Sequence, residues 1–354
     1  MPGPANSRGD VLERMTSAGA EQVMFAADPA SGLRLVVVIH DTTLGPSLGG
    51  VRMHPYPSED AALADGLRLS RAMTLKAAAA GLDLGGSTAL VLADPAADKN
   101  ERLLRAVGRF LGTMRSRFIA VNDVGTTSAD MQVLQRAGAR ACLRDPSPYT
   151  AQGVIESMRA VRSHAGHSAS LSGVHVAVQG VGNVGRAVVA QLEADGARIT
   201  VADLVSERAA AAAERHGAAV VDPAALLGVE CDVLCPCAMG SVVTAETFGR
   251  LRCQAIVGGA NNIVESPDLE QRLVSGGINY VPDFVASAGG LIALEEELLG
   301  HDDDSARRRV RRVRDTVQAV LAESVRNAER PAATAERMAA ERLAATTTSS
   351  GAGR

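Results

Sequence analysis

The chain carries 36 basic residues, but only two of them, Lys76 and Lys99, are lysines. Lys76 follows Met73, Thr74 and Leu75 and precedes a run of alanines, so it lies in an apolar segment. An arginine is always charged and presents a planar fork, whereas a lysine is a compact point charge whose pKa responds to burial. A lysine kept in such a segment indicates chemistry that a guanidinium cannot perform. The alternative is a lysine whose stem packs on a helix while its ammonium stays in water.

A second chemical motif is the glycine-rich segment Gly180-Val181-Gly182-Asn183-Val184-Gly185. It follows an apolar run and precedes a helical pattern, which is the strand, turn and helix context of a dinucleotide site. The first glycine permits a tight turn, the second lets the backbone approach a pyrophosphate, and the third lets the helix pack closely on the strand. Asp203 ends the next strand, where a carboxylate binds the adenosine ribose and repels a 2′-phosphate. The motif therefore predicts NAD as the cofactor, although the nearby Arg208 leaves NADP open.

Strands and helices alternate around these residues. In the first half the pattern predicts strands at 35–40, 89–93 and 117–121 and helices at 60–80 and 101–114. Two prolines, Pro146 and Pro148, then interrupt both patterns. Beyond them the sequence predicts helices at 151–165, 183–195, 206–215 and 302–330 and strands at 174–178, 199–202, 231–234, 255–258 and 278–281.

The alternation in the second half indicates βαβ winding on a mostly parallel sheet. We therefore expect an α/β protein with two domains. Residues 1–150 would form an N-terminal α/β domain for substrate binding and oligomerisation, and residues 151–330 a Rossmann-type, doubly wound domain for NAD. The segment 331–354 would pack back on the first domain. In the charged helix 302–330, the near-continuous arginines from Arg307 to Arg314 would form a solvated face.

Composition argues against several classes of function. The formal net charge is -4 and aromatic residues make up only 2% of the chain, which does not suit a nucleic-acid partner. Neither a signal peptide nor a long apolar span is evident, so we expect a cytoplasmic protein with no membrane partner. The five cysteines are odd in number and lack paired spacing, which argues against a disulfide framework. For Cys235-Pro236-Cys237, which has no histidine nearby, buried thiols are favoured over a metal site.

Several segments have no evident role in a core. In the first half they are Gly49-Gly50-Val51-Arg52, Met73-Thr74-Leu75-Lys76 and Asn122-Asp123-Val124-Gly125-Thr126-Thr127, and in the second half Pro148-Tyr149-Thr150-Ala151, Gly259-Ala260-Asn261-Asn262 and Ser287-Ala288-Gly289-Gly290. From about residue 35 to 343 the chain resembles the glutamate/leucine/phenylalanine/valine dehydrogenase family, nearest its leucine and valine branch. The resemblance implies a homo-oligomer that oxidatively deaminates L-amino acids to 2-oxo acids with NAD(P). It also implies a substrate bound between an N-terminal domain and a Rossmann domain.

The resemblance assigns roles to the residues at matching positions. Lys76 would hold the substrate carboxylate, Gly49 would contribute backbone at the carboxylate end, and Asp123 would accept a proton from the amino group. An apolar pocket for the substrate side chain would be lined by Leu48, Met73 and Val121, with Val317 or Val320 as further positions. The cofactor would contact the glycine-rich segment and Asp203, together with Thr150, Ala238, Asn261 and Ser287. The resemblance implies no metal.

One departure from the family bears on catalysis. After its first lysine the family has a glycine triplet and a second lysine, which activates the water that attacks the iminium carbon. Here the segment is Leu84-Gly85-Gly86-Ser87-Thr88, with Thr88 in the place of that lysine. A hydroxyl of very high pKa cannot act as a general base near neutral pH, and general acid–base catalysis contributes about 10²- to 10⁴-fold. We therefore expect ordinary deamination to be slow. Ser287, where the family usually has asparagine, is a second departure.

Two functional hypotheses follow. The first is an NAD-dependent oxidoreductase acting on an apolar L-amino acid, its 2-oxo acid or a related imine, because hydride transfer to a preformed imine needs no attack by water. The second is a non-catalytic member that binds NAD or an amino acid as a regulatory or assembly partner, which the loss of the lysine at position 88 suggests. The presence of Lys76, Asp123 and the whole dinucleotide motif favours the first hypothesis.

Overall fold

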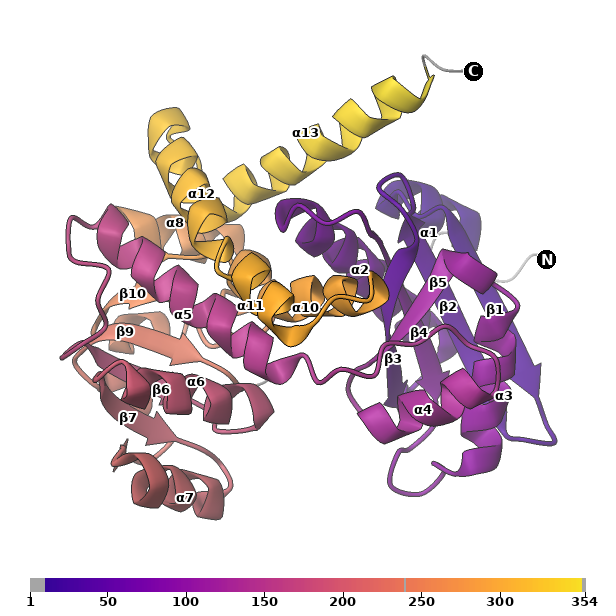
Figure 1. Cartoon of the computed structure of the whole chain (residues 1–354), viewed down its shortest axis with the longest axis horizontal. Helices are drawn as coiled ribbons and strands as arrows, with labels where there is room; N and C mark the ends of the chain where they lie inside the picture. Colours follow the sequence, from indigo (N-terminus) through magenta and orange to yellow (C-terminus); the bar gives the residue numbers. More distant parts are fainter. Residues whose placement is uncertain (1–9, 239, 352–354) are drawn as a thin grey trace, which may run out of the picture. The chain divides into compact units, whose positions relative to one another are not determined.

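The computed structural model describes residues 10–238 and 240–351. Contacts within the chain divide it into two compact units, each with its own β-sheet (Figure 1). Unit 1 comprises the residues up to 144 together with those from 341 onward, and unit 2 comprises residues 145–340. Within the described ranges, every helix is too short or too polar to span a lipid bilayer.

The sheet of unit 1 has five strands in the order β1-β2-β4-β3-β5. Strand β4 pairs antiparallel with β2 and parallel with β3, so the sheet is mixed. At its two edges, β1 is antiparallel to β2 and β5 is parallel to β3. The strands are β1 (Gln22–Asp28), β2 (Leu33–Asp41), β3 (Ser47–His54), β4 (Gly85–Leu92) and β5 (Phe118–Asn122).

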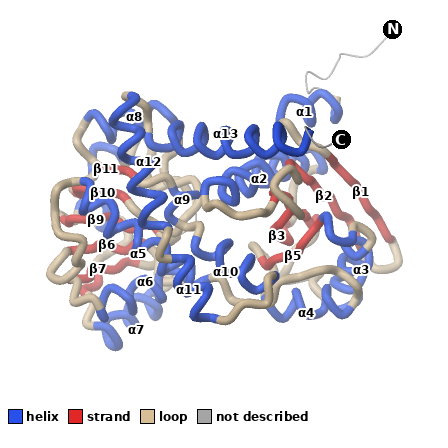
Figure 2. Tube along the Cα trace, turned by 45° about the horizontal axis from the view of Figure 1, so that its top comes forward, coloured by secondary structure: helices blue, strands red, loops and turns tan. Residues whose placement is uncertain are grey.

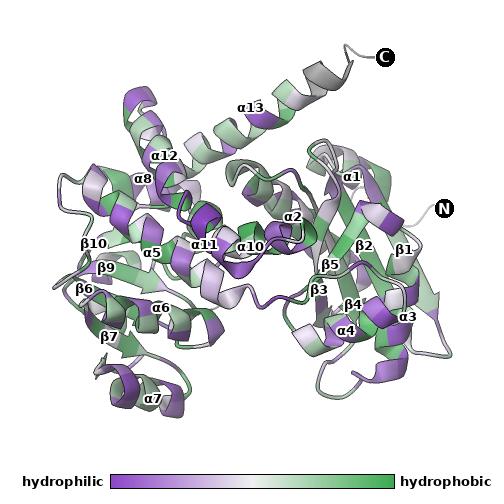
Figure 3. Cartoon of the chain, viewed as in Figure 1, coloured by the Kyte–Doolittle hydropathy of each residue, from purple (hydrophilic) through white to green (hydrophobic). Residues whose placement is uncertain are grey.

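Helices cover both faces of this sheet (Figure 2). Helix α2 (Glu59–Ala79) packs on one face, where Leu63 and Leu67 are buried against Val36, Val38 and Leu90. We call this side the α2 face. Helices α3 (Glu101–Gly112) and α4 (Ser128–Arg136) cover the opposite face with a larger apolar core. Since successive residues of a strand point to opposite faces, the two cores take alternate residues of each strand. The strands are accordingly among the most hydrophobic segments in Figure 3.

Two shorter elements complete the first part of unit 1. Helix α1 (Val11–Ala18) contacts α2, and the 3₁₀ turn η1 (Arg115–Arg117) precedes β5. Helix α2 begins at a side-chain cap, because the hydroxyl of Ser58 accepts a hydrogen bond from the backbone N–H of Ala61. Its alanine- and leucine-rich sequence has a high helix propensity, so the element forms as predicted.

The sheet of unit 2 has six strands in the order β11-β10-β9-β6-β7-β8, and all its pairs are parallel. The chain extends from β6 to one edge through β7 and β8, and to the other through β9, β10 and β11. This confirms the predicted doubly wound sheet, whose direction of winding changes between β6 and β9. The strands are β6 (His175–Gln179), β7 (Arg198–Ala202), β8 (Ala219–Val220), β9 (Cys231–Pro236), β10 (Cys253–Ile256) and β11 (Asn279–Tyr280).

The helices of unit 2 are α5 (Ser147–His164), α6 (Asn183–Ala194), α7 (Ser206–His216), α8 (Pro267–Ser275), α9 (Asp283–Ala286), α10 (Gly289–Leu298), α11 (Asp303–Val310) and α12 (Val313–Asn327), with the 3₁₀ turns η2 (Leu226–Gly228) and η3 (Phe248–Arg250). The last helix, α13 (Pro331–Gly351), begins in unit 2, and its residues from 341 onward belong to unit 1. There Arg342 donates hydrogen bonds to the carbonyl oxygen of Leu82 and to the carboxylate of Asp83.

The single helix predicted at 302–330 is wrong, because the chain breaks between α11 and α12. The arginines on the two sides of the break have different partners. Arg309 forms salt bridges to Glu295 and Glu296 of α10, both nearly fully buried, and Arg314 bonds to the buried Glu156 of α5. The expected solvated face is therefore correct for the exposed Arg308, Arg311 and Arg312, but wrong for Arg309 and Arg314, which pair with buried carboxylates.

Candidate active site

The α2 face of unit 1 carries most of the residues that the sequence placed at the amino-acid end of the site. In the register of the sheet, Gly50 of β3 lies between Thr88 of β4 and Val121 of β5. Leu48 lies two residues before Gly50 and therefore on the same face. Leu48 is fully buried, and Val121 is 7% exposed. These side chains form an apolar surface around the small residue Gly50.

Helix α2 approaches this surface closely at Gly86. A Cβ on Gly86 would lie only 2.2 Å from the backbone nitrogen of Thr74, so no larger residue fits there. Gly85 is equally constrained, since its Cβ would lie 2.0 Å from the carbonyl oxygen of Asp41. Met73 and Lys76 are neighbours of Thr74 on α2, and both are partly exposed. Gly86 therefore lets the end of α2 that carries Met73 and Lys76 pack closely on the sheet, whereas Gly85 lets β4 pack closely on the end of β2.

Asp123 follows β5 and reaches the α2 face beside Gly50. A Cβ on Gly50 would lie 2.9 Å from the Cβ of Asp123, so glycine is needed for this approach. Oδ2 of Asp123 accepts a hydrogen bond of 2.9 Å from Nε of Arg52. Nη1 of Arg52 also donates to Oδ2 of Asp65 on α2, at 3.1 Å. Arg52 thus joins Asp123 to the helix that covers this face.

The charges in this network support one another. Burial disfavours the charge of Arg52, but the Asp123 and Asp65 carboxylates outweigh this effect and raise the pKa of Arg52. Burial opposes the charge of Asp65 too, but hydrogen bonds from Tyr56 and Arg68 lower its pKa. Burial and the hydrogen bond to Asp65 raise the pKa of Tyr56, which therefore stays a neutral donor.

The loop that carries Asp123 is held by further contacts. Oγ1 of Thr126 accepts from the backbone N–H of Asp123 and donates to the carbonyl oxygen of Val51, at 2.7 Å. Lys99, the second lysine of the chain, donates to the carbonyl oxygen of Gly125 at 3.2 Å and to Oδ2 of Asp130 at 3.1 Å. Asp130 also closes the capping box at the start of α4. Lys99 is therefore a structural lysine.

Thr88 is only 2% exposed, and its Oγ1 donates a hydrogen bond of 3.1 Å to the carbonyl oxygen of Gly50. The hydroxyl proton of Thr88 is therefore already used in a hydrogen bond to the backbone. The neighbouring Ser87 points to the opposite face, where a Cβ on Gly49 would lie 2.5 Å from Ser87 Oγ. Gly49 can consequently offer only backbone, which is the role that the resemblance implies. Residue 88 lies on the α2 face, as Asp123 does, but the threonine side chain carries no charge.

The glycine-rich turn of unit 2 has the shape that a dinucleotide requires. Gly180 adopts a φ of +86°, which favours glycine, and a Cβ on Gly185 would lie 1.9 Å from the carbonyl oxygen of Gly180. In contrast, no described heavy atom lies within 4 Å of a Cβ placed on Gly182. Gly182 is also the N-cap of α6, and no side chain caps the first-turn N–H groups there. Open space in front of uncapped amides suits a bound pyrophosphate.

Asp203 lies next to this turn at the end of β7. Its Oδ2 accepts from the backbone N–H of Val181 at 2.7 Å, and its Oδ1 accepts from that of Val205 at 2.8 Å. The carboxylate therefore fixes the turn as well as offering lone pairs to a ribose. Arg208 lies 3.9 Å from Oδ1, so its charge is directed at Asp203.

The remaining residues predicted to contact the cofactor also lie in unit 2. Ala238 follows β9 and packs on Gly180, and Asn261 is exposed after β10. On the turn itself Asn183 is exposed, and Val184 contacts the position of a Cβ on Gly259. Thr150 lies at the start of α5, where its Oγ1 is 2.5 Å from the position of a Cβ on Gly290.

Ser287 and the two predicted valines have roles within the fold. Ser287 is 2% exposed, and its hydroxyl donates to the carbonyl oxygen of Asp283 at the end of α9. Val317 and Val320 are buried in unit 2 on α12, at 0% and 2% exposure. The Ser287 hydroxyl is therefore already bonded to the backbone, and the place of Val317 or Val320 in the substrate pocket stays a prediction.

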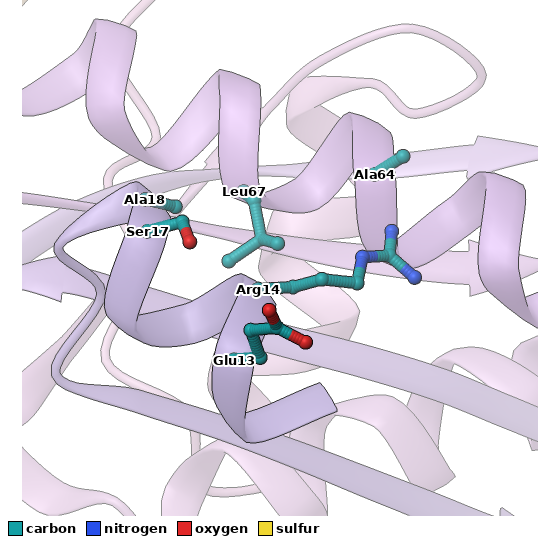
Figure 4. A pocket seen from close by; sticks show the side chains of 6 residues that line it. All are labelled: Glu13, Arg14, Ser17, Ala18, Ala64 and Leu67. Carbon is teal, nitrogen blue, oxygen red and sulfur yellow. The ribbon is translucent and has the colours of Figure 1, made fainter. Parts of the chain in front are cut away.

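A groove of about 500 Å³ lies elsewhere on unit 1, between α1 and the first half of α2 (Figure 4). It is lined by Glu13, Arg14, Ser17, Ala18, Ala64 and Leu67, none of which is a predicted site residue. In the part of the chain that the structure describes, no three histidine, cysteine or acidic residues are grouped to hold a metal ion.

The sequence analysis missed the residues that hold Asp123. Arg52 occurs in the Gly49–Arg52 motif, which was singled out without a role for the arginine. Asp65 and Tyr56 gave no signal, because only folding brings them into the hydrogen-bond network of Arg52 and Asp123. The scarcity of lysine in the chain was the one clue to Lys99.

Both units of the chain contain segments that match known proteins. Residues 21–139 match the family described as Glu/Leu/Phe/Val dehydrogenase, dimerisation domain, and residues 200–351 match the Glutamate/Leucine/Phenylalanine/Valine dehydrogenase family. The chain is 41% identical to leucine dehydrogenase from Geobacillus stearothermophilus, over 94% of this chain and 93% of that one. It is 40% identical to valine dehydrogenase from Streptomyces coelicolor, over 92% of this chain and 93% of the relative.

A solved structure has the same fold. L-tryptophan dehydrogenase from Nostoc punctiforme superimposes with a TM-score of 0.84 at 35% identity, covering 96% of this chain and all of that one. The similarity therefore extends through both units.

Proposed function

The chain belongs to the Glu/Leu/Phe/Val dehydrogenase family, and we propose that it is an NAD-dependent oxidoreductase that acts on an apolar L-amino acid, its 2-oxo acid or a related imine. The relatives named above are leucine, valine and tryptophan dehydrogenases, whose substrates have apolar side chains. The observation that carries the proposal is the α2 face, where Asp123 lies beside the apolar residues Leu48 and Val121.

We assign the amino acid to unit 1 and the dinucleotide to unit 2. The Lys76 ammonium pairs with the substrate carboxylate and thereby orients the alpha carbon. Among the described residues only Oδ2 of Asp123 accepts a side-chain hydrogen bond, from Arg52, which leaves Oδ1 for the substrate amine. Asp123 then accepts a proton from that amine. When bound, NAD supplies the hydride acceptor, or NADH the donor, at the alpha carbon.

On the cofactor side, the Gly180–Gly185 turn and the first amides of α6 would hold the pyrophosphate, and Asp203 the adenosine ribose. A carboxylate at the end of β7 supports NAD rather than NADP. Thr150, Ala238 and Asn261 are proposed at the nicotinamide end, while the Ser287 hydroxyl is already bonded to the backbone.

Thr88 determines which part of the family reaction is retained. Its hydroxyl donates to the Gly50 carbonyl and cannot take a proton from an attacking water near neutral pH. Hydride transfer at the alpha carbon does not depend on that water. We therefore propose that reduction of an imine, or of a 2-oxo acid that forms one with an amine, is faster relative to deamination than in relatives with the lysine.

The test is a substrate screen that follows NADH oxidation at high enzyme concentration. One set combines apolar 2-oxo acids with ammonia, and a second set contains cyclic imines with apolar substituents. We expect turnover in at least one set, and we expect Lys76→Met to raise KM for that substrate by roughly ten- to a hundredfold while NAD binding persists. The absence of turnover with every substrate, in protein that binds NAD, would refute the enzymatic proposal in favour of a binding role. The comparisons give that non-catalytic alternative no support.

We also propose a homo-oligomer in the cytoplasm. The family matched by residues 21–139 is described as a dimerisation domain, which supports self-association through unit 1. A cytoplasmic location is proposed because NAD and free amino acids are supplied there. Light scattering after size-exclusion chromatography measures the assembly, and a monomeric mass at micromolar concentration would contradict it.

A further inference from the structure

Two cysteines lie next to each other at the end of β9. Cys235 is fully buried and Cys237 is partly exposed, and their Sγ atoms are 3.7 Å apart. Residues two apart in an extended chain point to the same side, so the intervening Pro236 does not separate the two thiols. The pair has no part in the mechanism proposed above.

The pair borders the glycine-rich turn. The Cβ of Cys237 lies 3.3 Å from the position that a Cβ would take on Gly185, and its Sγ lies 3.8 Å from the corresponding position on Gly259. The backbone N–H of Cys237 donates to the carbonyl oxygen of Gln179 at 2.7 Å, immediately before the turn. Any displacement of Cys237 is therefore transmitted directly to the segment that begins at Gly180.

The two thiols differ in acidity. Either thiol of the pair can donate the hydrogen bond between the two Sγ atoms. Donation by the Cys235 thiol lowers the pKa of Cys237. The same bond, together with complete burial, raises the pKa of Cys235. Cys237, the less buried residue of the two, is thus also the one with more thiolate character, and the thiolate is the nucleophile. The buried sulfur remains a thiol within reach of the first.

We propose that Cys235 and Cys237 form an oxidation site at which a peroxide converts the two thiols into a disulfide. In the first step, Cys237 Sγ attacks a peroxide oxygen, the O–O bond breaks and hydroxide leaves, so that Cys237 becomes a sulfenic acid. In the second step, Cys235 Sγ attacks Cys237 Sγ, the S–O bond breaks, and the oxygen leaves as water with the proton of the Cys235 thiol. Two thiols are oxidised, and one hydrogen peroxide is reduced to two waters.

Disulfide formation must change the neighbourhood of the turn. A disulfide bond is about 2.0 Å long, so the two sulfurs have to approach each other considerably from their present separation. Because the ring contains only one intervening residue, strain makes the bond easily reduced and the modification reversible. The expected result is a lower affinity for NAD. This consequence rests on the proposed function, whereas the thiol chemistry does not.

The chain contains a matched control pair. Cys231 of β9 and Cys253 of β10 are direct partners in the register of the same sheet. Both belong to the apolar core of unit 2, and burial raises their pKa values to about 12 and about 11. Thiols of this kind are inert, so this pair should remain reduced under conditions that oxidise Cys235 and Cys237.

The experiment treats reduced full-length protein with graded hydrogen peroxide, alkylates the remaining thiols and measures peptide masses. We expect a loss of two hydrogen masses in the peptide that contains Cys235 and Cys237, reversed by dithiothreitol, while Cys231 and Cys253 are still alkylated. In Cys235→Ser the sulfenic acid of Cys237 should persist and react with dimedone. In Cys253→Ala the Cys235–Cys237 disulfide should form as in the wild type.

Three outcomes would overturn the proposal. The first is alkylation of both Cys235 and Cys237 after peroxide, in protein shown by circular dichroism to be folded. The second is equal oxidation of the control pair, and the third is an equal yield of sulfenic acid with and without Cys235. NAD titration of the oxidised protein tests the consequence separately, with at least a tenfold loss of affinity expected. If the disulfide forms and the affinity is unchanged, the link to the cofactor is wrong.

Discussion

The glycine-rich segments of the two units have different surroundings. In unit 1, protein atoms occupy the space beside Gly85 and Gly86, because a Cβ on either residue would lie about 2 Å from backbone atoms of β2 or α2. In unit 2, Gly180 and Gly185 are similarly constrained, but Gly182 faces open space. Unit 2 thus combines glycines that shape a turn with one glycine that leaves room for a ligand. In unit 1, Gly85 and Gly86 are both of the first kind.

The two candidate sites are consequently built from different interactions. The turn in unit 2 presents backbone amides, and its selectivity depends on space and on one carboxylate, Asp203. The α2 face in unit 1 depends on side-chain charges, with Asp123 fixed by Arg52 and its loop fixed by Lys99. Because Thr88 alters a charge without altering the glycines, the fold of unit 1 can persist while its acid–base chemistry is lost. Changes in unit 1 should act on catalysis, and changes in the turn should act on cofactor binding.

The largest effect is expected from a charge added at position 88. Thr88→Lys places an ammonium on the α2 face beside Gly50 and Asp123, and the added group could activate water. We expect the rate of oxidative deamination of an apolar amino acid to rise by about 10²- to 10⁴-fold, the range of general acid–base catalysis. The measurement is NADH formation under saturating NAD and amino acid.

Thr88→Met is the matched control, since it adds similar bulk without a charge. It should show no gain, and thermal unfolding of both variants reports whether the buried position tolerates the larger side chain. Wild-type activity as high as that of Thr88→Lys would show that the threonine is not limiting, and the contrast between the two units would then lose its chemical basis.

The second effect concerns the substrate carboxylate. Lys76→Met removes the proposed ammonium, and a hydrogen bond to a charged group contributes about 1.5–3 kcal/mol. We therefore expect KM for the amino or 2-oxo acid to rise by roughly ten- to a hundredfold, with NAD affinity unchanged. Lys76→Arg keeps the charge and should recover part of the loss. A parallel loss of NAD binding would show that Lys76 serves the fold rather than the substrate.

The sequence predicted the two sites unequally well, for reasons that these tests make clear. The turn at 180–185 is local, because its strand, glycines and helix are consecutive in the chain, and the doubly wound sheet around it is confirmed. The α2 face is assembled from β3, β4 and β5, and the sequence pattern predicted strands at β4 and β5 but not at β3. Strand β3 contains Gly49 and Gly50, which usually indicate a turn, and β1 is a partly buried edge strand whose apolar residues do not alternate with polar ones. Arg52 and Asp123 are 71 positions apart, so their ion pair left no local signal.

The third effect separates the two kinds of glycine within unit 2. In Gly182→Ala the added methyl group meets no protein atom, so the free energy of unfolding should change by less than about 0.5 kcal/mol. The same methyl group occupies the approach to the pyrophosphate, and we expect NAD affinity to fall at least tenfold. In Gly185→Ala the Cβ would clash with the carbonyl oxygen of Gly180, so both stability and NAD binding should suffer. Thermal unfolding with and without NAD distinguishes these outcomes. Undiminished NAD binding by Gly182→Ala would place the pyrophosphate elsewhere.

The smallest effect is expected at the second lysine, whose side chain is 26% exposed. Lys99→Met removes two hydrogen bonds that fasten the Asp123 loop, while Thr126 and Arg52 still hold it. We expect a loss of about 1 kcal/mol in the free energy of unfolding, measured by urea denaturation, and a severalfold decrease in kcat. Lys99→Gln, which keeps a donor without the charge, should retain part of the stability.

If charges hold this loop, the difference in the free energy of unfolding between Lys99→Met and the wild type should shrink in high salt, because salt screens exposed charges. The loss of stability in Gly185→Ala should not depend on salt. Equal salt dependence of the two variants would contradict the distinction between a site held by charge and a turn held by backbone shape.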